Sequence, residues 1–140
     1  MILLDTSGLL AALFSDQNGH DRCARALLGA QPPRLLSPFV LAELDDLILK
    51  HAGVEAELAL LEEIARGVYE LAPSDARDIG EARSTVDKYR DLRIGLADAS
   101  LVVLANRHDA RDVLTLDERH FRAMKPAPRQ RFRILPADDG

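Results

Sequence analysis

The chain begins with MILLDTSGLL (residues 1–10), in which an apolar run passes straight into a carboxylate. Three consecutive apolar residues are too few for a helix, so a short buried strand is expected over residues 2–5. The polar residues that follow can cap a helix, which the pattern predicts over residues 7–14. Asp5 therefore has two interpretations: it caps this helix, or it ends the strand as a metal ligand.

Length and composition indicate a single compact domain over residues 1–140, with the last few residues frayed. A chain of 140 residues that is 47% hydrophobic can bury a sizeable core. A single cysteine excludes an intramolecular disulfide and fits a reducing compartment. No apolar stretch approaches the roughly 20 residues of a membrane span, and the N-terminus lacks the features of a signal peptide. We therefore expect a soluble, cytoplasmic protein without a membrane partner.

Charge is distributed unevenly along the chain, whose net charge is −5. Residues 111–133 contain seven basic and three acidic side chains, so this segment carries +4 and the rest of the chain −9. A basic segment beside acidic chemistry is compatible with a phosphate-bearing substrate. On charge alone, however, a solvated C-terminal surface is the better interpretation.

Short apolar strands alternate with helices along the whole chain. Further strands are expected over 34–37, 68–72, 112–117 and 132–136. Further helices are expected over 20–29, 38–51, 54–66, 75–89, 96–108 and 118–123. This alternation predicts an α/β fold with a parallel sheet and helices on both faces. In such sheets ligands bind beyond the carboxyl ends of the strands, where Asp5 and Asp117 both fall.

Two acidic residues on predicted helices have competing interpretations. Glu43 has apolar neighbours one turn before and after it, which places its carboxylate near the core. A border residue with its stem on the core and its head in water is an equally good interpretation. Asp98 opens the most apolar helix of the chain, ADASLVVLA, so its first turn is expected inside the protein. Taken alone, Asp98 is better explained as a helix cap.

Two residues near the end of the fourth predicted strand are the remaining candidates for the site. Asp117 follows VLTL and precedes ERHF, so it too could cap a short helix. Thr115 points to the same side of the strand as Asp117, and its hydroxyl could support a carboxylate or a water. His120 stands three residues after Asp117 but lacks other clustered His or Cys, so we interpret it as a surface residue.

The four acids together are stronger evidence for a metal site than any one of them is alone. Two like charges 4 Å apart near a protein surface repel by roughly 4 kcal/mol, so a cluster at one sheet edge requires protons or cations. Carboxylate oxygens suit Mg²⁺ or Mn²⁺ rather than zinc. Such a pocket could support hydrolysis of a phosphodiester by a metal-activated water. These acids are Asp5, Glu43, Asp98 and Asp117.

Four motifs, in order, carry a resemblance to a known family. They are LLDTSGLLA, SPFVLAEL, GLADASLVVLA and VLTLDERHF. Together they resemble the PIN-domain ribonucleases, in particular the VapC toxins of toxin–antitoxin pairs. The resemblance spans nearly the whole chain and implies the PIN-like three-layer α/β/α fold, with a short-stranded and mainly parallel central sheet.

The same resemblance implies roles for particular residues. The four acids correspond to the family's Mg²⁺-binding quartet, with Mn²⁺ as a substitute, and Thr6 and Thr115 to its hydroxyl support. Val102 is apolar where some PIN domains carry a further acid, which implies one well-bound ion without substrate. Basic residues just beyond Asp117 could steer RNA toward the metal. These are Arg119, Arg122 and Lys125.

The family also implies an activity and partners. The activity is endonucleolytic cleavage of RNA, often tRNA or rRNA, and the partners are a second copy in a homodimer and a VapB-type antitoxin. Two alternatives remain open from the sequence: a housekeeping PIN nuclease in RNA maturation, and a non-catalytic PIN module that binds nucleic acid. The presence of all four acids favours an enzyme over the binding module.

Overall fold

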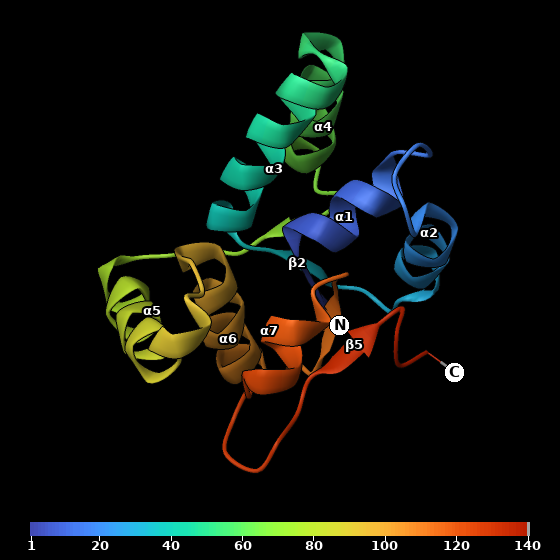
Figure 1. Ribbon diagram of the computed structural model, residues 1–140. Coiled ribbons are helices and arrows are strands. Elements are labelled where there is room, and N and C mark those ends of the chain that lie inside the picture. Colours follow the sequence, from blue (N-terminus) through green and yellow to red (C-terminus); the bar gives the residue numbers. More distant parts are fainter. Residues whose placement is uncertain (140) are drawn as a thin grey trace.

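The computed structural model describes residues 1–139, so the last residue of the predicted domain, Gly140, lies outside the described residues (Figure 1). The strands are β1 (Ile2–Leu4), β2 (Arg34–Leu36), β3 (Glu70–Leu71), β4 (Asp112–Leu114) and β5 (Arg133–Leu135). The helices are α1 (Thr6–Leu13), α2 (His20–Gly29), α3 (Pro38–Ala52), α4 (Val54–Ala65), α5 (Ala76–Lys88), the 3₁₀ turn η1 (Arg90–Leu92), α6 (Leu96–His108) and α7 (Glu118–Ala123).

The strands form one parallel sheet in the order β3-β2-β1-β4-β5. The first strand of the sequence therefore lies at the centre, paired with β2 on one side and β4 on the other. A parallel sheet covered on both faces needs strands that are apolar throughout, and the buried run at the start of the chain satisfies this need. This arrangement confirms the predicted α/β class.

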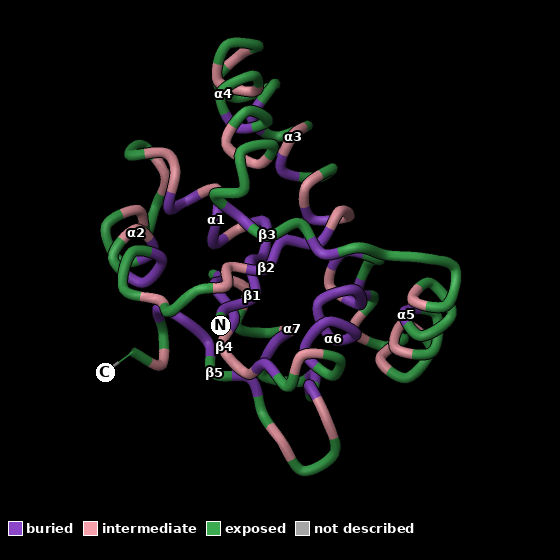
Figure 2. Tube along the Cα trace, turned by 180° about the vertical axis from the view of Figure 1, so that it is seen from behind, coloured by how far each residue is buried: buried purple, intermediate pink, exposed green. Residues whose placement is uncertain are grey.

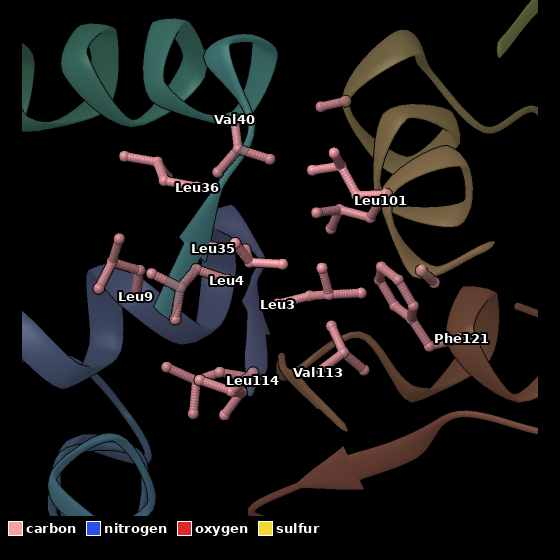
Figure 3. Packing of buried hydrophobic residues seen from close by; sticks show 14 of the residues in the cluster. Leu3, Leu4, Leu9, Leu35, Leu36, Val40, Leu101, Val113, Leu114 and Phe121 are labelled. Atoms are coloured by element: carbon pink, nitrogen blue, oxygen red, sulfur yellow. The ribbon is translucent and has the colours of Figure 1, made fainter. Parts of the chain in front are cut away.

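Helices cover both faces of the sheet, which gives the three layers that the motifs imply. On one face, Leu3 and Val113 meet Leu101 of α6 and Phe121 of α7 (Figure 3). On the other face, Leu4 and Leu114 lie beside Leu9 of α1, with α2 packed against α1 (Figures 1 and 3). Side chains alternate between faces along a strand, so Asp5 is directed to the same side as Leu3.

The α3–α4 hairpin projects from this three-layer body (Figure 1). Its first helix begins where the sequence predicts, because the hydroxyl of Ser37 accepts a hydrogen bond from the backbone of Phe39 and Pro38 occupies the first helical position. Leu60 is the one buried residue of α4, and the burial map shows α4 as mainly exposed or half-buried (Figure 2). No helix within residues 1–139 combines the length and apolar character needed to cross a bilayer.

The predicted boundaries differ from the structure mainly at strand ends. The fourth strand is expected to run to residue 117 but ends at Leu114. The backbone turns there because the Thr115 hydroxyl accepts the backbone N–H of Asp117 at 2.9 Å, which draws the chain out of the sheet. The third strand is likewise shorter than the expected 68–72, and the η1 turn is not predicted.

Gly8 allows α1 to approach β4 closely enough to complete one layer. A methyl group at this position would overlap the Leu114 carbonyl and lie 2.8 Å from the backbone nitrogen of Thr115. We expect Gly8→Ala to lower the free energy of unfolding by about 2 kcal/mol or more, because backbone cannot yield as a flexible side chain can. Gly80→Ala on α5 is the matched control, since nothing lies within 4 Å of its added methyl.

Denaturant titration of the two variants measures this difference. Gly80→Ala should stabilise the protein by roughly 0.5–1 kcal/mol, which is the helix propensity gain of alanine over glycine. Equal stabilisation by Gly8→Ala would show that α1 does not need this close approach.

Candidate metal centre

Asp5 lies immediately after β1, where its side chain is almost completely buried, with the residue 5% exposed. Its Oδ2 accepts hydrogen bonds from the hydroxyls of Thr115 at 2.6 Å and Ser7 at 3.0 Å. Although Asp5 occupies the position before α1, its side chain makes no capping hydrogen bond. The capping interpretation of Asp5 is therefore wrong, and its carboxylate is directed toward other side chains instead.

The pKa of Asp5 is raised from 3.8 to about 6. Burial is the main cause, because removal from water disfavours the charged form. The hydrogen bond from Thr115 opposes this shift, and the negative charge of Asp98 adds to it. A carboxylate from α6 therefore acts electrostatically on one that follows β1.

Asp98 lies in the first turn of α6, and the residue that caps this helix is Gly95. Its Oδ2 accepts a hydrogen bond from His120 Nδ1 at 2.8 Å, so the helix-cap interpretation of Asp98 is also wrong. Burial raises the pKa of Asp98, and His120 opposes the rise, while the charges of Asp117 and Glu43 increase it. Asp98 thus interacts with acids from three other elements of the fold.

Asp117 caps a helix, as one of its two interpretations predicts, and its second carboxylate oxygen faces a histidine. Its Oδ1 accepts the backbone N–H of His120 at 3.1 Å, which caps α7. Its Oδ2 lies 3.0 Å from Nδ1 of the same histidine. The cap therefore fixes the carboxylate in the position where it faces Asp98.

Glu43 is exposed on α3 but is directed by a hydrogen bond from the first helix. The buried Thr6 hydroxyl donates to Glu43 Oε1 at 2.9 Å. The border interpretation correctly describes its exposure, while its charge still raises the pKa of Asp98. Thr6 and Thr115 thus each hold a carboxylate, although Thr115 holds Asp5 rather than Asp117.

His120 is not the free surface residue that the sequence suggests. Its side chain is 20% exposed, and Nδ1 lies between Oδ2 of Asp98 and Oδ2 of Asp117. Both partners are carboxylates, so Nδ1 carries a proton and donates it when they are ionised. The only sequence signal was the spacing of three from Asp117.

Ser7 is a second site residue that the sequence analysis did not single out. It donates to Asp5 and accepts the backbone N–H of Leu116 at 3.0 Å. Its position two residues after Asp5 also allows a 3.2 Å contact with the Thr115 hydroxyl. Ser7 therefore ties the start of α1 to the chain that follows β4.

The predicted RNA-contacting residues differ in whether their charges are already paired within the protein. Arg122 is paired with Glu118 at 3.0 Å and Asp138 at 2.7 Å, which lowers the pKa of Asp138 to about 2. Arg119 and Lys125 are exposed. Contact of all three with RNA stays a prediction, and Arg122 would have to exchange protein partners for phosphate.

The donor set fits a divalent cation. Asp98, Asp117 and His120 each have one atom that could bind a cation, and these atoms lie within 4.8 Å of one another. While Nδ1 of His120 donates to the two carboxylates it cannot bind the cation itself, so the carboxylate oxygens are the available donors. The buried carboxylate of Asp5 adds oxygen donors and negative charge close by. Carboxylate oxygens suit Mg²⁺ and Mn²⁺.

A family model described as PIN domain matches residues 2–125 of the chain. The chain belongs to the PIN-domain family. Ribonuclease VapC26 of Mycobacterium tuberculosis is 44% identical over 135 residues, which cover 96% of this chain and 100% of that protein. This similarity confirms the resemblance to the VapC group that the four motifs carry.

Solved structures confirm the fold. VapC20 of Mycobacterium tuberculosis, described as a toxin that cleaves the sarcin–ricin loop, superposes with a TM-score of 0.79 at 18% identity, covering 86% of this chain and 92% of its own. VapBC2 of Rickettsia felis, bound to a DNA fragment from its promoter, gives a TM-score of 0.67 at 20% identity, covering 96% and 98%.

The raised pKa of Asp5 predicts a pH-dependent stability of the metal-free protein. At pH 4 the group is still protonated in the folded state but already about half ionised in the unfolded chain, and the folded state bears the full cost of the buried charge only near pH 7 and above. We expect the free energy of unfolding in EDTA to fall by about 2.5 kcal/mol as the pH rises from 4 to 7. The raised pKa of Asp98 acts in the same direction.

Denaturant titrations across this pH range measure the effect. Asp5→Asn should make the decline shallower, whereas Asp46→Asn, which alters an exposed carboxylate on α3, should keep the wild-type profile. A wild-type decline in Asp5→Asn would mean that Asp5 is not the titrating group.

Removal of the histidine should disturb its nearest carboxylate. We expect His120→Ala to raise the pKa of Asp98 further, because the opposing contribution of His120 is lost. Carboxyl ¹³C NMR titration in EDTA measures this shift directly. His51→Ala is the control, since His51 pairs with Asp16. An unchanged pKa of Asp98 in His120→Ala would contradict the hydrogen bond.

Proposed function

We propose that this protein is a metal-dependent endoribonuclease toxin of a VapBC-type pair, which hydrolyses RNA phosphodiester bonds with a water activated by Mg²⁺, or by Mn²⁺ as a substitute. The observation that carries the proposal is the clustering of acids from distant segments: ligand atoms of Asp98 and Asp117 lie within 4.8 Å of one another, and the charge of Asp98 raises the pKa of the buried Asp5. Such a concentration of negative charge is costly without a cation. The 44% identity to a ribonuclease of the same family supports this interpretation.

In this proposal the cation is held by Asp5, Asp98 and Asp117, and it supplies Lewis-acid charge and a lowered pKa for water. The chain's own residues fix the geometry. Thr115 and Ser7 orient Asp5, and His120 holds Asp98 beside Asp117. Orientation of ligands by neighbouring hydrogen bonds usually tunes both affinity and activity.

Glu43 has a different role in the proposal. The Thr6 hydroxyl donates a hydrogen bond to Oε1 of Glu43, and Glu43 is an exposed residue. Glu43 could therefore orient a water or accept its proton as attack on phosphorus begins. The geometry before attack then depends on four side chains from four separate elements.

The proposed partners are those expected for this family. The substrate is RNA, with tRNA or rRNA as the expected class, and VapC20 is described as a toxin that cleaves the sarcin–ricin loop. A toxin–antitoxin complex from Klebsiella pneumoniae, with a TM-score of 0.67 at 18% identity and coverage of 91% and 98%, supports an antitoxin partner of the VapB type. We propose a homodimer that acts in the cytoplasm, with one well-bound ion per active site before substrate binds.

Cleavage of labelled total RNA by the purified protein tests this function. Wild type should cleave with Mg²⁺ and not with EDTA, and Asp98→Asn should lose more than about 100-fold in rate because a metal ligand is changed. The variant should be at least as stable as wild type without metal, since one repelling charge is removed. Asp46→Asn serves as the matched control and should cleave normally.

Each alternative predicts a different result. Cleavage that persists in Asp98→Asn would mean a contaminant or a misassigned site. Absence of cleavage by wild type, tested on rRNA and tRNA after removal of any bound antitoxin, would favour the non-catalytic binding module. Cleavage of many RNAs without cellular toxicity would favour a housekeeping nuclease.

A further inference from the structure

A cavity of about 280 Å³ lies between α5, α6 and the segment that follows α7. Its walls include Lys88, Tyr89, Asn106 and Lys125. The whole chain contains three lysines, and two of them line this one cavity. Glu81 is the acidic residue on its wall, so the lining carries a net positive charge in a protein whose net charge is −5.

Tyr89 contacts both lysine residues, one through its ring and the other through its hydroxyl. The Tyr89 hydroxyl accepts the backbone N–H of Lys125 at 3.0 Å, which ties the segment after α7 to the end of α5. Lys88 Nζ lies 5.4 Å from the centre of the same ring. Within residues 1–139, neither lysine takes part in an ion pair, in contrast to the doubly paired Arg122.

Two segments of the chain connect the acidic cluster with this cavity. Val102 on the cavity wall is one helical turn after Asp98, so their side chains are about 6 Å apart on one face of α6. In α7, His120 contacts Asp98, and Lys125 follows five residues later. Figure 1 shows α5, α6 and α7 as neighbours. The cavity therefore adjoins the site where the scissile phosphate would lie.

We propose that this cavity is a subsite for a nucleotide of the RNA substrate next to the cleaved bond. The inference rests on the proposed function, which places RNA at the acidic cluster. A nucleic acid repeats its negative charge along the backbone, so a neighbouring phosphate meets Lys88 and Lys125 once the scissile phosphate is at the cluster. The exposed amide of Asn106 can donate to a base or ribose in the same cavity.

Fluorescence anisotropy with a 5′-labelled, mixed-sequence, single-stranded RNA of 20 nucleotides tests the subsite. All variants carry Asp98→Asn so that the RNA stays intact, and Mg²⁺ is present. We expect Lys88→Gln plus Lys125→Gln to weaken binding by about tenfold at 0.1 M salt. The slope of log affinity against log salt should fall by about 1.4, because each phosphate contact on a single strand contributes about 0.7.

The third lysine provides the control. Lys50→Gln removes an exposed lysine on α3 that is already paired with Asp46, so it should leave affinity and slope unchanged. If the double variant and Lys50→Gln have the same RNA affinity and the same salt slope, the proposed subsite is refuted. The proposed function is tested separately, by the cleavage assay with wild type. That assay depends on the acidic cluster, whereas the test of the subsite depends on the RNA affinity of the double variant. Wild-type cleavage together with unchanged RNA affinity in the double variant would refute the subsite alone.

Discussion

The carboxylate of Asp5 is buried at the end of the central strand, and its burial constrains the rest of the site. Its pKa of about 6 shows how far this environment disfavours the charged form. The protein compensates partly, since Thr115 and Ser7 each donate a hydroxyl to Asp5 Oδ2. Negative charge from Asp98 works against this compensation. The fold therefore maintains a local concentration of negative charge that a cation would neutralise.

Three helices begin at this point of the molecule. Asp5 immediately precedes α1, Asp98 lies in the first turn of α6, and Asp117 immediately precedes α7. The N-terminus of a helix carries partial positive charge and stabilises a nearby anion, typically by 0.3–1 kcal/mol at a surface. The convergence of these N-termini offsets part of the repulsion among the carboxylates. The helix N-termini thus reduce the repulsion among the acids without fully cancelling their charge.

Packing on the opposite face of the sheet supports the same geometry. Because Gly8 has no side chain, α1 can lie against the backbone of β4 at Leu114 and Thr115. That approach brings Ser7 within 3.2 Å of the Thr115 hydroxyl, so both can bind Asp5. A close backbone contact and the orientation of a buried carboxylate are therefore parts of one arrangement.

The sequence alone predicts the fold class, which the structure confirms, and it names four acids whose role as a metal site stays a prediction. Apolar strands too short for helices, alternating with amphipathic helices, leave few arrangements other than a covered parallel sheet. The roles of individual acids were not determined in this way, because Asp98 looks like a helix cap when only its neighbours in sequence are considered. Only the folded structure shows that Asp98 contacts His120, a residue 22 positions away, and that Arg122 pairs with Asp138. Local patterns report periodicity and capping, whereas hydrogen bonds and ion pairs between distant segments depend on how the helices pack across the sheet.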